Sequence, residues 1–285
     1  MLEAFDTGPL SWVKDEIDQS LKKVLASFNE VSQNVSDFAS LRLTLAHLYQ
    51  VNGALDMVGL EGCRRYCSEI EKLTNKLALE IVPVNPEVMA QLLLAVETLS
   101  QYLQDLLNGA PDIPMRLYPT LKPLVEAQGE SIDESELFFP HTDISTPRDL
   151  PVNSIEESSI PIFVAEQRAV FQKSLLDWLL TKNPSALNHM REAIVKVQQV
   201  QVKNAPRTLW WAASAFADAL TQAKVGDDNG AKKLCRKLDR QLGNLSLGDA
   251  KAPSQLLREL LYYVAISDRV TELISRVKDV FELDD

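Results

Sequence analysis

Apolar residues recur at the spacing of an α-helix along most of this sequence, and that periodicity constrains the fold more than any other feature. Residues 41–60 show it well, because Leu41, Leu48 and Leu55, together with Leu45 and Val58, fall on one side of a helix. Alternating apolar and polar runs, which are typical of strands, are few, and the chain has only 10 glycines. We therefore predict an all-α protein.

Helix-start and helix-stop signals divide the first part of the chain into four amphipathic segments and a shorter fifth one. Ser36 or Asp37 can cap the second segment. Asn85-Pro86 has the form of a cap followed by a first-turn proline, and Asn108-Gly109 can end the fourth segment. Short connections favour an antiparallel bundle. The expected helices cover about residues 11–28, 37–60, 63–79, 86–107 and 114–127, the last interrupted or bent by Pro119 and Pro123.

Residues 129–160 differ in composition from the sequence on either side. This segment holds eight acidic residues, three prolines and one basic residue, Arg148, so it carries a net charge of −7 out of −11 for the chain. Such a composition is typical of a solvated linker. Leu137-Phe138-Phe139 departs from it, because two adjacent phenylalanines in a flexible segment would expose a costly apolar surface. We expect these three residues to dock on a helical bundle.

From residue 161 onward the helical spacing returns, and Asn183-Pro184 again has the form of a cap and a first-turn proline. The expected organisation is two antiparallel helical bundles, residues 1–128 and 161–285, joined by the acidic linker 129–160. The two halves share a similar order of helices without clear repetition, so the second bundle could be a duplicate of the first. Its helices are expected near residues 163–178, 184–197, 206–220 and 228–243, with one or two more within 254–281.

A glycine inside the predicted helix of residues 41–60 needs an explanation, because Gly53 costs roughly 1 kcal/mol there relative to alanine. Met57-Val58-Gly59-Leu60 follows it. Helical phosphotransfer (HPt) domains carry a similar pattern, His-x-x-Lys-Gly followed after three residues by an apolar pair, Gly and Leu. Here Tyr49 stands at the histidine position and Asn52 at the lysine position. The stretch resembles a phosphotransfer helix that lacks its phosphorylatable residue.

Two further motifs extend this resemblance. They are Leu-Ser-Trp-Val-Lys-Asp-Glu-Ile at residues 10–17 and Asp-Ile-Pro-Met at residues 112–115. With them the chain resembles the N-terminal region of the CheA-like histidine kinases of type IV pilus chemosensory systems (Chp/PilL type). The stand-alone FimL proteins are related to the same region. The resemblance implies that the first bundle is a degenerate HPt domain.

The resemblance also implies a function. The chain would be a non-catalytic regulatory or docking module of a chemosensory two-component histidine kinase that controls type IV pili. Its partners would be response regulators or polar scaffold proteins of that system, bound through a groove near Tyr49, Asn52 and Gly53, with Gln50 and Asp56 as further contacts. Two alternatives remain open, a stand-alone FimL-like adaptor and an active phosphotransfer domain that uses His47 or His189. Because the sequence ends without a glycine or proline stop, it could be a piece of a longer kinase.

The candidate phosphoryl acceptors are weak. Tyr49 cannot replace histidine in the relay, because a phosphotyrosine ester does not readily return its phosphoryl group to an aspartate. His47 lies on a different face of the helix from Tyr49, and no Lys-Gly follows His189. His141 lies in the acidic linker. Each histidine is expected to be an ordinary polar side chain.

Metal and nucleotide sites are not expected. Cys63 and Cys67 are four residues apart on one helical face, but no further ligands at zinc-site spacing accompany them, so both are predicted to be buried free thiols. The phosphate-binding motifs G-x-x-x-x-G-K-[ST] and G-x-G-x-x-G are missing, as are the boxes of a histidine-kinase ATP domain. We expect neither a cofactor nor catalytic residues.

Trp210-Trp211 lies about where the relay motif would fall in the second bundle, within the run WWAASA. Adjacent tryptophans face different sides of a helix, so one of them can point outward and bind a partner. In the other interpretation both belong to the core under the C-terminal helix.

Composition excludes several classes of protein. The chain of 285 residues is 46% hydrophobic and 24% charged, which is ordinary for a globular protein. No apolar run approaches the roughly 20 residues that span a bilayer, and the N-terminus lacks the pattern of an export signal. The net charge of −11 argues against nucleic acid as a partner. Three cysteines, an odd number, favour reduced thiols and a cytoplasmic protein.

Overall fold

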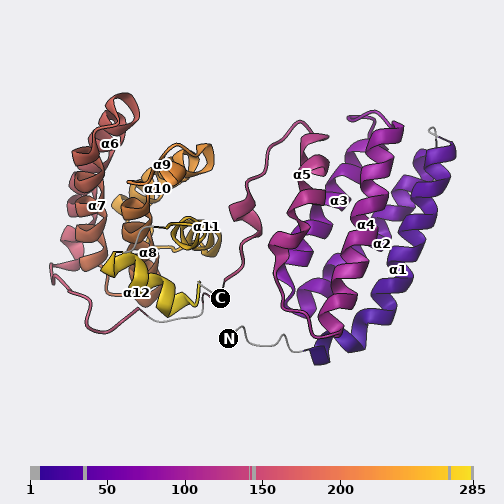
Figure 1. Cartoon of the computed structure of the whole chain (residues 1–285), viewed down its shortest axis with the longest axis horizontal. Coiled ribbons are helices and arrows are strands. Elements are labelled where there is room, and N and C mark those ends of the chain that lie inside the picture. Colours follow the sequence, from indigo (N-terminus) through magenta and orange to yellow (C-terminus); the bar gives the residue numbers. More distant parts are fainter. Residues whose placement is uncertain (1–6, 35–36, 141, 143–145, 269–270, 284–285) are drawn as a thin grey trace. The chain divides into compact units, whose positions relative to one another are not determined.

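The computed structural model describes residues 7–34, 37–140, 142, 146–268 and 271–283, and within these ranges it contains helices and no strand (Figure 1). The prediction of an all-α fold is confirmed. Contacts divide the chain into two compact units, Met1–Phe139 and Pro140–Asp285.

Four long helices form the body of the first unit. α1 contacts α2 and α4, and α3 contacts the same two helices, so the four close into a bundle that α5 covers on the side of α3 and α4 (Figure 1). The bounds are α1 Thr7–Gln33, α2 Phe38–Met57, α3 Glu61–Ala78, α4 Pro86–Leu107, the 3-10 helix η1 Pro114–Leu117 and α5 Tyr118–Glu126.

α2 and α4 begin at the predicted caps, whereas α1, from Thr7 to Gln33, extends beyond the expected residues 11–28 at both ends. The Asp37 carboxylate accepts a hydrogen bond of 3.1 Å from a first-turn N–H of α2. The Asn85 side chain does the same for α4 at 2.9 Å, with proline in the first turn. α4 ends at Leu107 with Asn108 as its C-cap, and Gly109 follows with φ of 91°. Ser36, the other candidate cap of α2, lies outside the described residues.

The core of the first unit is formed by the predicted apolar stripes, each member of which contributes roughly 1.5–3 kcal/mol through its burial. Cys63 and Cys67 lie in this core as free thiols, which confirms their prediction. Leu45 and Val58 of the predicted α2 stripe are only half-buried. The fully buried members include Ile17, Leu21, Val24, Phe28, Leu41, Leu48, Leu55, Tyr66, Ile70, Leu73, Leu92, Val96, Leu99 and Leu103.

Residues 129–139 belong to the first unit, so the interpretation of this part as a solvated linker is wrong. Leu137, at the end of the 3-10 helix η2 (Glu134–Leu137), is fully buried in the core. Phe139 is partly buried and packs against the same core, and Phe138 is half-buried. The predicted docking of these three residues is confirmed for Leu137 and Phe139. The acidic composition of the whole segment suggested a solvated linker. The position of residues 129–139 is instead determined by the burial of two apolar side chains, Leu137 and Phe139.

The second unit is built around α8. This helix contacts α7, α11 and α12, while α10 contacts α6 and α11. Residues 254–281, which could have been one helix, form two. The bounds are η3 Glu157–Ser159, α6 Ile160–Thr181, α7 Pro184–Gln199, α8 Asn204–Ala219, α9 Ala223–Gly226, α10 Asn229–Ser246, α11 Ser254–Ala265 and α12 Glu272–Phe281.

A second part of the predicted linker, residues 146–153, lies along the second unit, and we call it the strap. The N–H and hydroxyl of Thr146 donate to the Asn204 side chain at 3.3 and 3.1 Å. The carbonyl of Leu150 accepts from the Arg207 guanidinium at 2.6 Å. Asp149 forms an ion pair with Arg276 of α12. The acidic segment is therefore held to folded helices on this side as well.

Ion pairs reinforce the docking of residues 129–139 on α3. The Glu130 carboxylate accepts hydrogen bonds from Lys72 at 2.6 Å and from Lys76 at 2.8 Å. These lysines lower the pKa of Glu130 from its ordinary value of 4.5 to about 2. Arg65 of α3 also pairs with Glu136 at 3.2 Å.

We expect the two lysines to make the docking of Glu130 dependent on pH. Because the folded-state pKa lies below 4.5, the contact stabilises the fold above that pH and is lost as the pH falls towards 2. In a ¹³C NMR titration, replacing both Lys72 and Lys76 with methionine should return the carboxyl titration towards the ordinary value. Lys122→Met on α5 is the matched control and should leave Glu130 unchanged. An unaltered Glu130 titration in the double variant would contradict this assignment.

Candidate functional site

α2 has one face in the bundle core and one in solvent. Its inner face is buried, including Leu41, Leu48, Val51 and Leu55. The side chains of Leu43, Tyr49 and Met57 are 69%, 72% and 78% exposed. Small exposed residues alternate with them. The outer face of α2, as we name it, consists of Ala39, Leu43, Ala46, Tyr49, Gly53 and Met57.

Gly53 lies at the centre of this outer face and has no packing role. It is exposed, and a Cβ built on it meets no atom within 4 Å. Close packing, one of the two explanations for a glycine in this helix, is therefore excluded. The other explanation, a surface kept bare for a partner, remains as a proposal.

Gly59, the second glycine of the motif, has a structural explanation. It follows the end of α2 with φ of 76°, a conformation that residues with a Cβ rarely adopt. The N–H of Gly59 bonds to the Asp56 carbonyl at 3.1 Å, and that of Leu60 bonds to the Leu55 carbonyl at 3.0 Å. This is the hydrogen-bond pattern of a Schellman cap, and the buried Leu60 completes it. Gly59 and Leu60 thus end the helix, and only Gly53 is left without a structural reason.

Two of the polar residues around Gly53, Asn52 and Asp56, contact α3. Asn52, at the lysine position of the motif, is half-buried and donates to the Glu71 carboxylate at 2.5 Å. Asp56 is exposed and pairs with Arg64 at 3.2 Å. Gln50 is exposed beside Tyr49. Of the five predicted site residues on α2, Tyr49, Gln50, Gly53 and Asp56 are exposed, and Asn52 instead connects the helix to α3.

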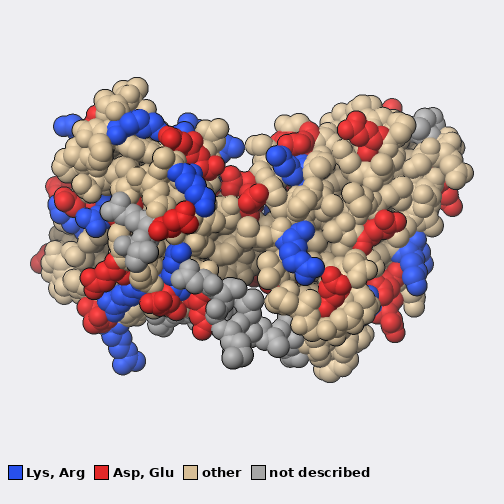
Figure 2. Space-filling view, viewed as in Figure 1, with Lys and Arg blue, Asp and Glu red and all other residues tan. Residues whose placement is uncertain are grey.

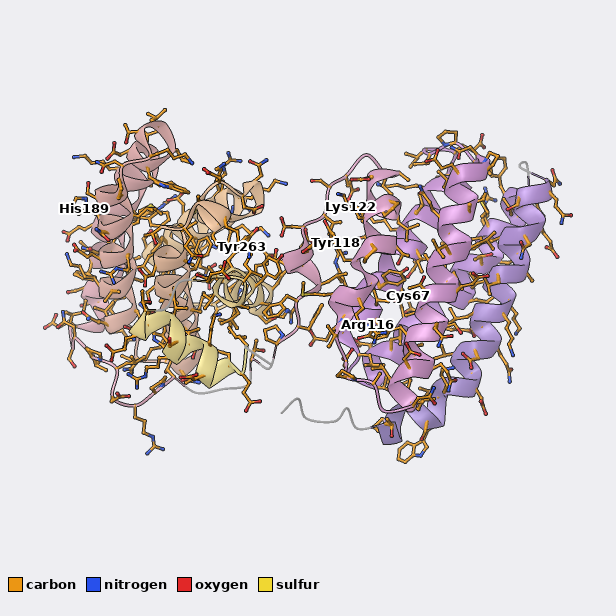
Figure 3. All side chains as sticks on the ribbon, viewed as in Figure 1. Cys67, Arg116, Tyr118, Lys122, His189 and Tyr263 are labelled. Atoms are coloured by element: carbon orange, nitrogen blue, oxygen red, sulfur yellow. The ribbon has the colours of Figure 1, made fainter. Side chains whose placement is uncertain are left out.

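His47 does not form a site with Tyr49. His47 is half-buried on another side of α2, and its Nδ1 is buried without a hydrogen-bond partner among the described residues. His189 is exposed on α7 (Figure 3). His141 lies outside the described residues.

Trp210 and Trp211 are 1% and 2% exposed, so the hypothesis that one of them points outward to a partner is wrong. The physical reason is that α8 is buried on every side, with each residue from Thr208 to Ala219 inside the unit. Trp211 stacks at an angle on Phe281 of α12, with ring centroids 6.1 Å apart. The run WWAASA is therefore core and cannot present a relay residue to solvent.

The described part of the chain holds no group of three or more His, Cys, Asp or Glu that could bind a metal ion. Its cysteines are buried, and desolvation raises the pKa of each thiol, to about 12 for Cys235. Cys67 lies inside the first unit (Figure 3). Among the described helices, none combines the length and the apolar character needed to cross a membrane.

Surface charge on the visible face is mixed. In the view of Figure 2, acidic and basic residues are scattered among uncharged ones, and no basic patch covers either unit. The outer face of α2 is mainly apolar, but Arg42 is exposed among its residues and Asp56 lies at its edge. Recognition there would depend on shape and apolar contact, with Arg42 as the cation available to a partner.

Residues 156–285 match the family described as FimL scaffold protein second domain. The chain is similar to a FimL scaffold protein. Scaffold protein FimL of Pseudomonas aeruginosa strain PAO1 is 25% identical over 264 residues, which cover 91% of this chain and 47% of that protein. The chain thus spans about half the length of the curated relative that it matches. No solved structure matches the chain.

The expected relation to FimL is confirmed by these similarities, while the relation to CheA-like kinases and to HPt domains is not. The matched family covers most of the second unit, whereas the outer face of α2 lies in the first unit, for which the similarity to FimL itself is the link. Sequence reasoning missed Leu43 and Ala46 as members of that face. The small residues Ala39, Ala46 and Gly53 at intervals of seven would have indicated it.

We expect the two glycines of the motif to respond oppositely to alanine. Gly53→Ala should raise the free energy of unfolding by about 0.5–1 kcal/mol, because its Cβ lies in open space on a helix. Gly59→Ala should lower it by about 1–2 kcal/mol, because of the left-handed backbone. Urea denaturation followed by circular dichroism measures both changes. Loss of stability in Gly53→Ala would mean that the glycine has a packing role after all.

Proposed function

We propose that the chain is a non-catalytic, FimL-like adaptor that binds protein partners of a type IV pilus chemosensory system through the outer face of α2. The proposal rests on the observation that Gly53, a residue that destabilises a helix, lies in the middle of an exposed helix face with open space around it. The similarity to a scaffold protein supports the same class of function.

The outer face of α2 has the chemistry of a docking surface. Tyr49 and Met57 flank Gly53 at one helical turn on either side, and both are more than 70% exposed. Aromatic residues and methionine are enriched where proteins bind one another. The absence of a side chain at Gly53, with Ala46 two turns before it, lets a partner approach the helix backbone closely. Exposed apolar residues in such a row mark interaction sites.

The adaptor alternative now stands ahead of the kinase-module interpretation. The curated relative is named a scaffold protein, and nothing in the comparisons points to a kinase. Because the chain spans about half of that relative, the identity of its partners is part of the proposal. Response regulators and polar scaffold proteins of the pilus system are the partner classes that the resemblance implies.

The site itself is unsuited to phosphotransfer. Tyr49 presents a phenol to solvent where an imidazole would have to accept the phosphoryl group, and Asn52 supplies no positive charge. A degenerate HPt domain would retain the docking surface of an active one and lose the chemistry. We propose that the first unit is such a domain.

Substitutions on the outer face of α2 should abolish binding without unfolding the protein. Gly53→Leu and Tyr49→Asp should each weaken partner capture about tenfold or more. The leucine side chain would fill the space over residue 53, and the aspartate would introduce a charge that loses its water when the partner binds. Pulldown with the response regulators and polar scaffold proteins of the host system measures this. Leu94→Asp on α4, where the native side chain is 53% exposed, is the control. Unchanged capture in both outer-face variants would refute the docking site.

A phosphotransfer assay tests the non-catalytic part of the proposal. We expect no label on the chain after incubation with a phosphorylated kinase core and radiolabelled ATP, because no histidine stands at the site. His47→Gln and His189→Gln identify the acceptor if label appears. Acid-labile phosphate lost in either variant would favour the active phosphotransfer alternative instead.

A further inference from the structure

The second unit contains a cavity of about 400 Å³ that no part of the proposed function uses. Its walls come from α7, α8, the first turns of α12 and the strap. This volume lies within the range of sites that hold small ligands or the side chains of a peptide. Leu150, Leu273 and the Trp211 ring contribute apolar surface, and the other residues that line the cavity are polar or charged.

Two hydrogen-bond donors of the cavity residues have no acceptor among the described residues. The Trp211 residue is only 2% exposed, and its buried indole N–H has no hydrogen-bond acceptor among the described residues. Leaving such a group unsatisfied costs roughly 1–3 kcal/mol. The half-buried Arg191 of α7 forms no ion pair or hydrogen bond with a described residue. Asn188, one turn before it on α7, adds an exposed amide.

The first turn of α12 contributes to the same side of the cavity. The Thr271 hydroxyl accepts from the Ile274 N–H at 3.2 Å, while the neighbouring first-turn N–H groups lack helical acceptors. The positive end of a ten-residue helix therefore adds to the donors from α7 and α8.

Acidic residues limit the charge that the cavity can accept. Asp218 is buried and takes a hydrogen bond of 2.6 Å from Thr271, and Glu272 stands exposed at the start of α12. The charge of Arg276 is balanced by Asp149 of the strap. Among the described lining residues, Arg191 is the cation without an ion-pair partner, so one negative charge fits better than the two of a phosphate.

The strap shows which anion this region already binds. Its Asp149 carboxylate lies on Arg276, and the next residue, Leu150, forms part of the cavity wall. A peptide segment that carries an aspartate is thus held beside the cavity. A guanidinium binds a carboxylate with two parallel hydrogen bonds, and Arg191 has its donors available for a second carboxylate.

We propose that this cavity binds a single carboxylate, supplied by an acidic peptide or a small organic acid, with Arg191 and the indole N–H of Trp211 as its donors. The inference rests on the second unit and is independent of the outer face of α2.

Indole N–H signals in a ¹H–¹⁵N NMR spectrum of the whole chain test the proposal. Trp211→Phe assigns the Trp211 signal, and Trp12, Trp178 and Trp210 serve as internal references. The probes, at constant ionic strength, are acetate, acetyl-Asp-Leu-amide, acetyl-Asn-Leu-amide and inorganic phosphate. We expect a saturable shift of the Trp211 signal with acetate and with the Asp dipeptide only. Tighter binding of the dipeptide indicates a peptide as the source, and equal affinity indicates a small acid.

Variants locate the site. Arg191→Gln should weaken binding about tenfold or more, because it removes the charge-assisted bonds. Asn188→Asp, which places a negative charge at an exposed lining position, should also weaken binding. This variant replaces Arg191→Gln in the test if Arg191→Gln unfolds the protein. Arg236→Gln, an exposed position on α10, is the matched control and should bind normally. No saturable shift, binding unaffected by the two cavity variants, or tighter binding of phosphate would each overturn the proposal.

Discussion

Burial of one side of α2 fixes which residues this helix shows to solvent. Leu41, Leu48, Val51 and Leu55 are locked between α1 and α3, so the helix cannot rotate without exposing them. Tyr49, Gly53 and Met57 are presented outward as a direct consequence. The bundle therefore acts as a rigid support for the outer face of α2, whose exposed side chains lie outside the core of the bundle.

The sequence predicted the features that depend on local chemistry. The caps at Asp37, Asn85 and Asn183, the apolar stripes and the buried thiols all followed from residue types at fixed spacing. The docking of Leu137 and Phe139 was predicted from their exposure cost, but which distant residues hold the segment could not be predicted. Glu130 is held by Lys72, which lies 58 residues away in the sequence, and the composition of residues 129–160 does not reveal that contact.

The candidate site divides in the same way. That Tyr49 stands at the histidine position of the pattern that the sequence resembles was visible in the sequence, but the roles of the two glycines were not. Only backbone angles show that Gly59 ends a helix, and only the empty space around Gly53 shows that it packs against nothing. The burial of Trp210 and Trp211 was also undecided, because an aromatic pair on a helix can form a partner-binding surface or part of the core until its neighbours are known.

The buried thiols make the folded chain nearly silent to thiol reagents, because desolvation suppresses the reactive thiolate form. Two of them, Cys63 and Cys67, lie in the first unit, and Cys235 lies in the second. Alkylation of each cysteine therefore requires its own unit to open. Each unit of the native protein thus contains at least one cysteine whose alkylation reports on the opening of that unit. Mass spectrometry of the alkylated cysteines can therefore measure the opening rates of the two units separately.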